Sequence, residues 1–124
     1  MDSCKQIEIS KAVLPWLATA GYMALIFFLS SRNVNLPPVL PKYFDKLVHV
    51  LIYMPLAFLF VLSLRVSGFN KYIFLISFLL AGVYGITDEL HQSFVPGRDA
   101  SAADAVADFI GAGLGCFVAS RGRS

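Results

Sequence analysis

The sequence predicts an all-α integral membrane protein built as a four-helix bundle, and two observations carry that prediction. First, the 124-residue chain is 57% hydrophobic and only 15% charged, with a mean hydropathy of +0.70. A soluble domain of this size has too little interior to bury so much apolar surface, so lipid is expected to cover it. Second, the apolar residues fall into four runs, each long enough to cross a hydrocarbon core of roughly 30 Å as a helix.

The first run, residues 12–30, contains no charged residue. Its apolar part exceeds the roughly 7–15 residues of a signal-peptide core, so we expect a retained helix. The second run, residues 44–66, carries Asp45, Lys46 and His49 in its first two turns. Pro55 lies inside this run, and its missing N–H is expected to kink the helix.

The third run, residues 71–91, has no charge from Tyr72 to Thr87 and ends in the polar block YGITDELHQSFVPGR, residues 84–98. The fourth run, residues 102–120, is rich in Ala and Gly. Gly111 and Gly115 form a GxxxG pair there, which allows two membrane helices to approach closely. The two aspartates of this run share the same stripe, so we expect the packed face to carry the carboxylates.

The distribution of Lys and Arg predicts the orientation. On one side, the two chain ends and the helix ends that flank the second connection hold six of these residues: Lys5, Lys11, Arg65, Lys71, Arg121 and Arg123. The other side holds four: Arg32, Lys42, Lys46 and Arg98. Positive residues favour the cytoplasm, so both termini are predicted to be cytoplasmic. This orientation brings the polar ends of the second, third and fourth helices together at the outer face.

Ionisable side chains inside a membrane are costly, and they usually face a protein interior or a wet cavity and serve a function. A desolvated carboxylate can act as a general acid or base near neutral pH, and a histidine titrates closest to physiological pH. The predicted catalytic residues are His49, Glu89, Asp104 and Asp108. The predicted substrate-binding residues are Asp45, Lys46, Tyr53, Asp88, Gln92 and Arg98. Of these, Lys46 and Arg98 suit an anion such as a lipid phosphate.

Simpler roles remain open for several of these residues. Lys46 and Arg98 could extend to lipid head groups from the ends of their helices. Tyr53 could be a packing residue or an interface anchor. Asp45 could cap its helix, and the helix dipole would favour Asp104 in a first turn.

A metal site is the main chemical alternative, because enough N and O donors for zinc or another divalent ion are present in His49, Glu89, His91, Asp104 and Asp108. However, no established spacing such as H-E-x-x-H is present, so acid–base chemistry is preferred and no cofactor is expected. Cys4 and Cys116 lie near opposite chain ends and show no metal-ligand spacing. A net charge of +2 without a basic stripe argues against nucleic acid as a partner.

Three segments of the chain resemble the VanZ-like family of bacterial membrane proteins. They are FDKLVHVLIY (44–53), the block at 84–98, and the D-x3-D-x2-G-x3-G pattern from Asp104 to Gly115. The resemblance runs from about Ala12 to Gly115 and implies a compact four-helix membrane domain that fills the chain. The family's founder is associated with reduced susceptibility to teicoplanin, but no defined biochemical activity comes with the family name. At Asp108 many members look to have Asn, so this chain adds a titratable charge there.

The resemblance matches the family's motif residue by residue. The matching positions are Asp45, Lys46, His49, Tyr53, Glu89, Gln92, Pro96, Gly97, Arg98 and Asp104.

Three functional hypotheses follow. In the preferred one, a multi-pass protein of the bacterial cytoplasmic membrane uses an outward-facing polar pocket to bind or modify the head group of an envelope lipid or cell-wall precursor. In the alternative, the protein is a non-enzymatic membrane scaffold or partner whose polar network only fixes helix packing. Ion or proton passage ranks last, because residues 72–87 offer no charged path across the membrane. The sequence leaves open whether there is a reaction and which oligomer forms.

Overall fold

The computed structural model describes residues 3–31, 44–69, 71–96 and 101–121 of the chain. They form four helices and, within the described residues, no strand, so the predicted all-α fold class is confirmed. The helices are α1 (Ser3–Ser30), α2 (Phe44–Val66), α3 (Ile73–Gln92) and α4 (Ala102–Arg121). Each contains a stretch long and apolar enough to cross a membrane. In α1 that stretch begins at Lys11, so the first two turns precede it.

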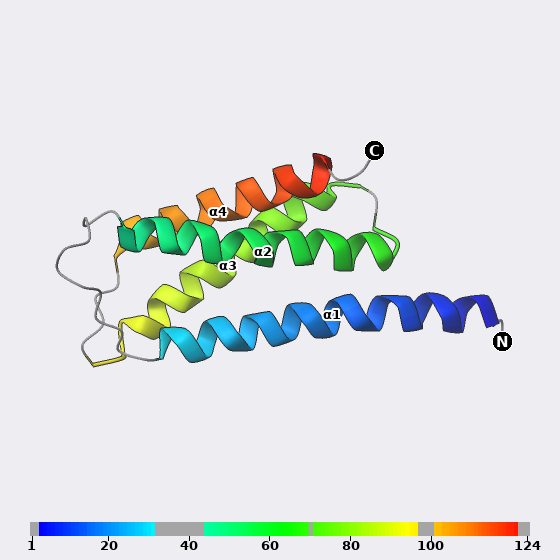
Figure 1. The fold of residues 1–124 in the computed structure, drawn as a ribbon, viewed down its shortest axis with the longest axis horizontal. Coiled ribbons are helices and arrows are strands. Elements are labelled where there is room, and N and C mark those ends of the chain that lie inside the picture. Colours follow the sequence, from blue (N-terminus) through cyan, green and yellow to red (C-terminus); the bar gives the residue numbers. More distant parts are fainter. Residues whose placement is uncertain (1–2, 32–43, 70, 97–100, 122–124) are drawn as a thin grey trace.

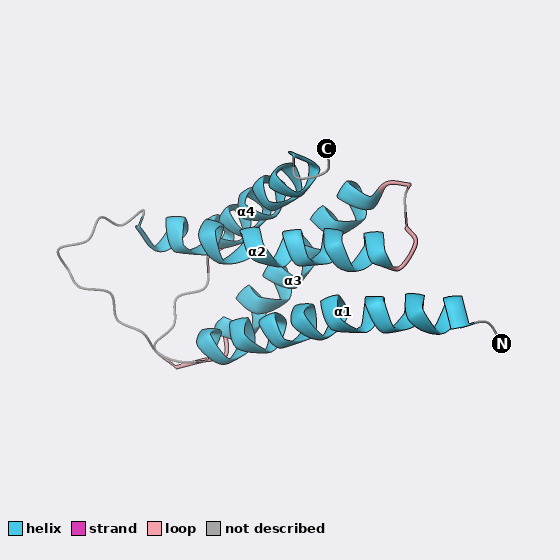
Figure 2. Ribbon diagram, turned by 45° about the vertical axis from the view of Figure 1, so that its right-hand side comes forward, coloured by secondary structure: helices cyan, strands magenta, loops and turns pink. Residues whose placement is uncertain are grey.

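The helices pack around α2 (Figure 1). Its most extensive contact is with α4, which runs beside it in the same direction, while α1 and α3 run in the opposite direction (Figures 1 and 2). Helix α1 packs on α2 and touches α3 only slightly. Only 11% of the α1 span is buried, against 39–44% of the other three, so α1 is the peripheral helix of the bundle.

Two glycines of α4 produce the close contact with α2. A Cβ atom added at Gly111 would lie 2.4 Å from the carbonyl oxygen of Val50, and one at Gly115 would lie 2.2 Å from that of Met54. Such distances leave no room for a side chain, so the GxxxG pair is used within the chain. Asp104 and Asp108 are buried on the same stripe, which confirms that the packed face of α4 carries the carboxylates.

The apolar core is centred on α2, which buries Tyr53, Leu56, Ala57, Phe60, Val61 and Leu64. The outer faces of the helices are also apolar, as in Leu14 of α1 and Leu90 of α3, which are 73% and 61% exposed. Helix α2 continues through Pro55. Beside it, the Tyr22 hydroxyl of α1 donates a hydrogen bond to the carbonyl oxygen of Ile52, next to the carbonyl that Pro55 leaves without its N–H partner. This hydrogen bond therefore links α1 to α2 in the turn that precedes Pro55.

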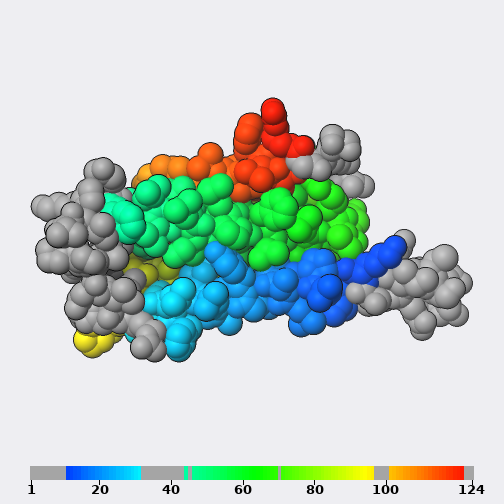
Figure 3. All heavy atoms as spheres, viewed as in Figure 1, coloured from blue at the N-terminus to red at the C-terminus, as the bar shows by residue number. Residues whose placement is uncertain are grey.

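The start of α2, the end of α3 and the start of α4 lie at one end of the bundle, together with the end of α1 (Figure 1). The space-filling view shows α2 between α1 and α4 along the molecule, with little of α3 visible from this side (Figure 3). The charged residues that the sequence predicts to form a site lie at this end of α2, α3 and α4, where a membrane surface would lie. The described beginning of α1 and the end of α4 lie at the opposite end. Which end faces the cytoplasm stays a prediction.

Candidate functional site

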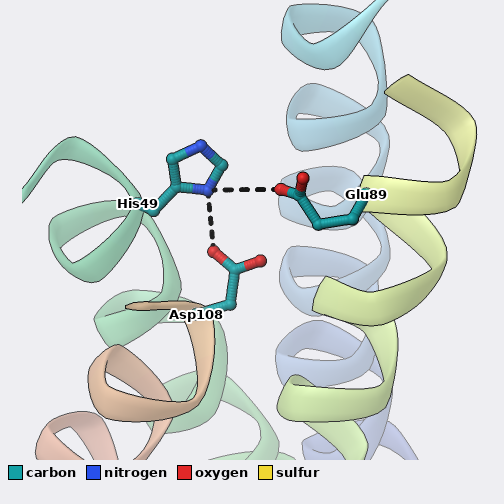
Figure 4. A group of neighbouring side chains, drawn as sticks. All are labelled: His49, Glu89 and Asp108. Atoms are coloured by element: carbon teal, nitrogen blue, oxygen red, sulfur yellow. Dashed lines mark hydrogen bonds and ion pairs between the residues drawn. The ribbon is translucent and has the colours of Figure 1, made fainter. Parts of the chain in front are cut away.

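Three helices each contribute one side chain to the centre of the site (Figure 4). His49 of α2 lies with its Nδ1 atom 2.8 Å from Oδ1 of Asp108 on α4. The same Nδ1 is 3.8 Å from Oε1 of Glu89 on α3. All three residues are buried, and Asp108 is fully so. The structure therefore brings together three of the four residues that were predicted to be catalytic.

The fourth, Asp104, lies on the other side of the histidine ring. Its Oδ2 atom is 4.0 Å from Nε2 of His49, and its Oδ1 atom is 2.7 Å from Nζ of Lys46. Asp104 is buried, whereas the Lys46 side chain is 38% exposed. The ion pair thus joins a buried carboxylate to a cation that reaches the edge of the bundle. We refer to Lys46, His49, Asp88, Glu89, Asp104 and Asp108 as the polar cluster.

Ser101, which the sequence did not single out, positions two of these carboxylates. It precedes α4, and its Oγ accepts a hydrogen bond from the backbone N–H of Asp104 at 3.2 Å, as an N-cap residue does. Its own backbone N–H donates to Oε2 of Glu89 at 3.3 Å. The start of α4 is therefore tied to the end of α3. A serine three residues before an aspartate was the sequence signal for this cap.

Among the three other predicted binding residues in the described part of the chain, Tyr53 and Gln92 both contact Asp88. The Tyr53 hydroxyl donates to Oδ2 of Asp88 at 3.2 Å, and Nε2 of Gln92 donates to the same oxygen at 3.4 Å. All three residues are buried. The hydrogen bond from Tyr53 to Asp88 links α2 to α3. The role of these residues as substrate ligands stays a prediction.

Two predicted residues are not placed. Arg98 lies outside the described residues, and so does the side chain of Asp45.

A second histidine contact links α1 to the same end of the bundle. The Ser31 Oγ lies 2.8 Å from Nε2 of His91, and the His91 ring stacks on Phe27 with centroids 4.3 Å apart. Sequence reasoning gave Ser31 no site role, although it belongs to the FFLSSR segment that ends the first span, and it offered His91 only as one possible donor of a metal site. This contact fixes the exit of α1 beside the polar cluster.

The charges of the polar cluster do not balance by themselves. Four buried carboxylates face one lysine and one histidine among the described residues. Buried carboxylates without a counter-charge must bind a proton or a cation, because transfer of an isolated charge from water is very costly. A buried histidine oriented by a carboxylate can transfer protons, and the same donor atoms can hold a divalent ion.

A family model described as VanZ/LLP1 matches residues 6–122 of the chain. No curated protein and no solved structure matches it.

Proposed function

The chain belongs to the VanZ/LLP1 family, and from this premise we propose that its polar cluster binds an anionic head group at one membrane face and modifies it by proton transfer. The head group would be that of an envelope lipid or a cell-wall precursor. The observation that carries the proposal is the buried His49–Asp108 contact of 2.8 Å at the polar end of four apolar helices. A costly ionisable pair at this depth is a typical sign of function.

His49 is the proposed proton acceptor. When Asp108 is ionised it can only accept this hydrogen bond, so Nδ1 of a neutral His49 carries the proton and the lone pair lies on Nε2. A carboxylate that fixes the tautomer of a histidine in this way makes the opposite ring nitrogen the base. Nε2 lies on the side of Asp104 and the partly exposed Lys46, toward the proposed position of the head group.

Lys46 is the proposed anchor for the anionic group. Its Nζ atom holds Asp104 at 2.7 Å while more than a third of its side chain is exposed. An ammonium in this position can contact a phosphate without leaving its carboxylate, because it has three donors. Arg98 is the last residue of the polar block and is proposed as a second anchor, since a guanidinium can bind phosphate in a bidentate manner.

The proposal is tested with the full chain purified in detergent. Binding of phosphatidylglycerol and of a lipid-linked cell-wall precursor is compared with that of phosphatidylcholine by native mass spectrometry. We expect selective binding of the anionic lipids and its loss in H49A, E89A and R98A. The matched control is S63A, which removes a buried hydroxyl of α2 that contacts Thr19 rather than the polar cluster. Unchanged binding in all three cluster variants removes the proposal.

A structural role is the second candidate, and it is favoured by the hydrogen bonds that buried Tyr53 and Gln92 both donate to Oδ2 of Asp88. In that case the protein would be a membrane scaffold whose network fixes helix packing. The test is thermal unfolding in detergent beside cellular activity. If alanine at Glu89 or Asp104 unfolds the protein while variants that remain folded keep full activity, the structural role is correct.

A further inference from the structure

We propose that His49, Glu89 and Asp108 form a binding site for a divalent transition-metal ion, for which Zn²⁺ is the best match. One ligand atom from each residue lies within 4.8 Å of the other two. The two measured separations from Nδ1 of His49 are 2.8 Å to Asp108 and 3.8 Å to Glu89. They bracket the ~3.4 Å between neighbouring ligand atoms that a tetrahedral ion with bonds of ~2.1 Å requires.

Unpartnered oxygen atoms at the centre of the site support this inference independently. Oε1 of Glu89 and Oδ2 of Asp108 are buried, and within the described residues neither accepts a hydrogen bond. The Ser101 N–H holds the other oxygen of Glu89, so Oε1 is the atom that faces His49 (Figure 4). A buried carboxylate oxygen without a partner is costly, and a bound cation would remove that cost.

The charge of the three ligands fits a divalent ion. Two carboxylates and a neutral imidazole together carry two negative charges, which one divalent cation neutralises. Lys46 does not neutralise these two carboxylates. It pairs with Asp104, which lies near Nε2 of His49, on the opposite side of the ring from Nδ1. The site would therefore be neutral once it is filled, as a buried ion site in an apolar surrounding should be.

The surroundings of His49 also match a metal ligand. A histidine that coordinates through one nitrogen usually directs its other N–H toward a carboxylate, and Nε2 of His49 faces Oδ2 of Asp104 at 4.0 Å. One imidazole with two carboxylates favours Zn²⁺ or Mn²⁺ over soft ions. Within the described residues the site has three protein ligands, which leaves a fourth position for another ligand, as in catalytic rather than structural zinc sites.

This inference goes beyond the proposed function and uses the opposite histidine nitrogen. A cation would coordinate Nδ1, so that Nε2 carries the proton and cannot be the base. With the ion bound, His49 loses its proposed role as proton acceptor, while Lys46 and Arg98 can still bind the head group. Metal binding and head-group binding can therefore be tested, and can fail, independently of each other.

The test is metal binding by the full chain in detergent, stripped with a chelator and titrated with Zn²⁺ by calorimetry, with the metal content measured after dialysis. We expect about one Zn²⁺ per chain, and an affinity lower by more than about 10-fold in H49A, E89Q and D108N, since even the loss of an outer-shell partner costs 10- to 100-fold. The matched control is H91A, which removes a histidine at the same end that contacts Ser31. It should bind Zn²⁺ as the wild type does.

Wild-type protein that remains folded and binds no stoichiometric Zn²⁺ or Mn²⁺ overturns the inference, and this result does not depend on how the variants fold. Equal losses in H91A and H49A overturn it as well. A visible d–d spectrum of tetrahedral Co²⁺ in the wild type, absent in E89Q, would support it. If stripped protein still selects anionic lipids but binds no metal, the inference fails and the proposed function stands. If the protein binds Zn²⁺ but does not select anionic lipids, the proposed function fails and the metal inference stands.

Discussion

Gly85 of α3 lies directly against Asp108 of α4: a Cβ atom at position 85 would come within 2.7 Å of the Asp108 Cβ and 2.8 Å of its Oδ2. The missing side chain creates the space that the buried carboxylate occupies. Asp108 in turn reaches Nδ1 of His49 at 2.8 Å. The shape of the polar cluster therefore depends on a glycine that carries no chemistry of its own.

The first prediction concerns this space. In G85A the added methyl group should push the Asp108 side chain away from His49, and binding of anionic lipid or Zn²⁺ should fall. The nearest obstacle is the Cβ atom of Asp108, which side-chain rotation cannot move, so α3 and α4 must shift apart. The free energy of unfolding should therefore fall by about 1–3 kcal/mol, the usual cost of overpacking. Ligand binding and thermal unfolding in detergent measure the two effects. G21A is the control, because its Cβ would meet nothing within 4 Å. Full ligand binding by G85A would contradict the prediction.

The second prediction concerns the contact between α2 and α4. In G111A and G115A the new Cβ atom would meet backbone carbonyl oxygens, which cannot rotate away. The helices must separate, so each variant should lose at least about 1–3 kcal/mol of stability. G113A is the matched control on α4, since its Cβ would lie 3.8 Å from the Phe78 ring, an ordinary contact. If G113A lowers the stability as much as G111A does, the loss in G111A does not come from the close contact between α2 and α4.

The third prediction concerns the ion pair of Lys46 and Asp104. K46Q should destabilise the protein, because it leaves a carboxylate that is 2% exposed without its cation. The loss should be about 1 kcal/mol, below the ~3–5 kcal/mol of a fully buried pair, because solvent screens the partly exposed lysine. The double variant K46Q/D104N should recover part of it. K11Q, which changes an exposed lysine of α1, is the control. A double variant less stable than K46Q would show that Lys46 does not compensate this charge.

The fourth prediction concerns the attachment of α1. Y22F removes the hydrogen bond to the Ile52 carbonyl and should lower the free energy of unfolding by about 0.6 kcal/mol, the average for such bonds between membrane helices. Chemical unfolding in mixed micelles measures it. Tyr72 is 64% exposed, so Y72F serves as the comparison and should have no effect. Equal stabilities of Y22F and the wild type would mean that this bond does not hold α1.

The fifth prediction concerns orientation. After replacement of Cys4 and Cys116, single cysteines at Ser93 and Phe69 probe the two ends of the bundle. Both positions are exposed, one at the end of α3 near the polar cluster and one in the connection before it. A membrane-impermeant maleimide should label S93C from outside the cell and F69C only after the cells are opened. The reverse pattern would place the polar cluster at the cytoplasmic face.

Length and hydropathy were enough to predict the four helices, because each span must satisfy its own backbone in lipid. The GxxxG pair likewise predicted which face of α4 packs. In both cases the information is local, since it depends on residue types at fixed spacing along one helix.

The contacts of the polar cluster could not be predicted in the same way. Helical spacing predicts only that Asp45 or Lys46 can touch His49 on their own helix. The contacts of Lys46 with Asp104 and of His49 with Asp108 join different helices, and spacing along one helix cannot predict them. Such pairs depend on the rotation and depth of α4 relative to α2, which backbone contacts at the glycines set. For the same reason no metal-motif spacing exists in the sequence: the three proposed ligands come from three different helices.

The most direct test of the central claim is the envelope lipid profile of a strain that lacks this protein, complemented with wild type, H49A, E89Q or the S63A control. Fluorescence-detected gel filtration would show that each variant is folded and equally abundant. We expect one class of anionic lipid or lipid-linked precursor to change in the deletion strain, to return with wild type and S63A, and to stay changed with H49A and E89Q. Full restoration by both folded cluster variants would contradict the claim that these residues act on a head group.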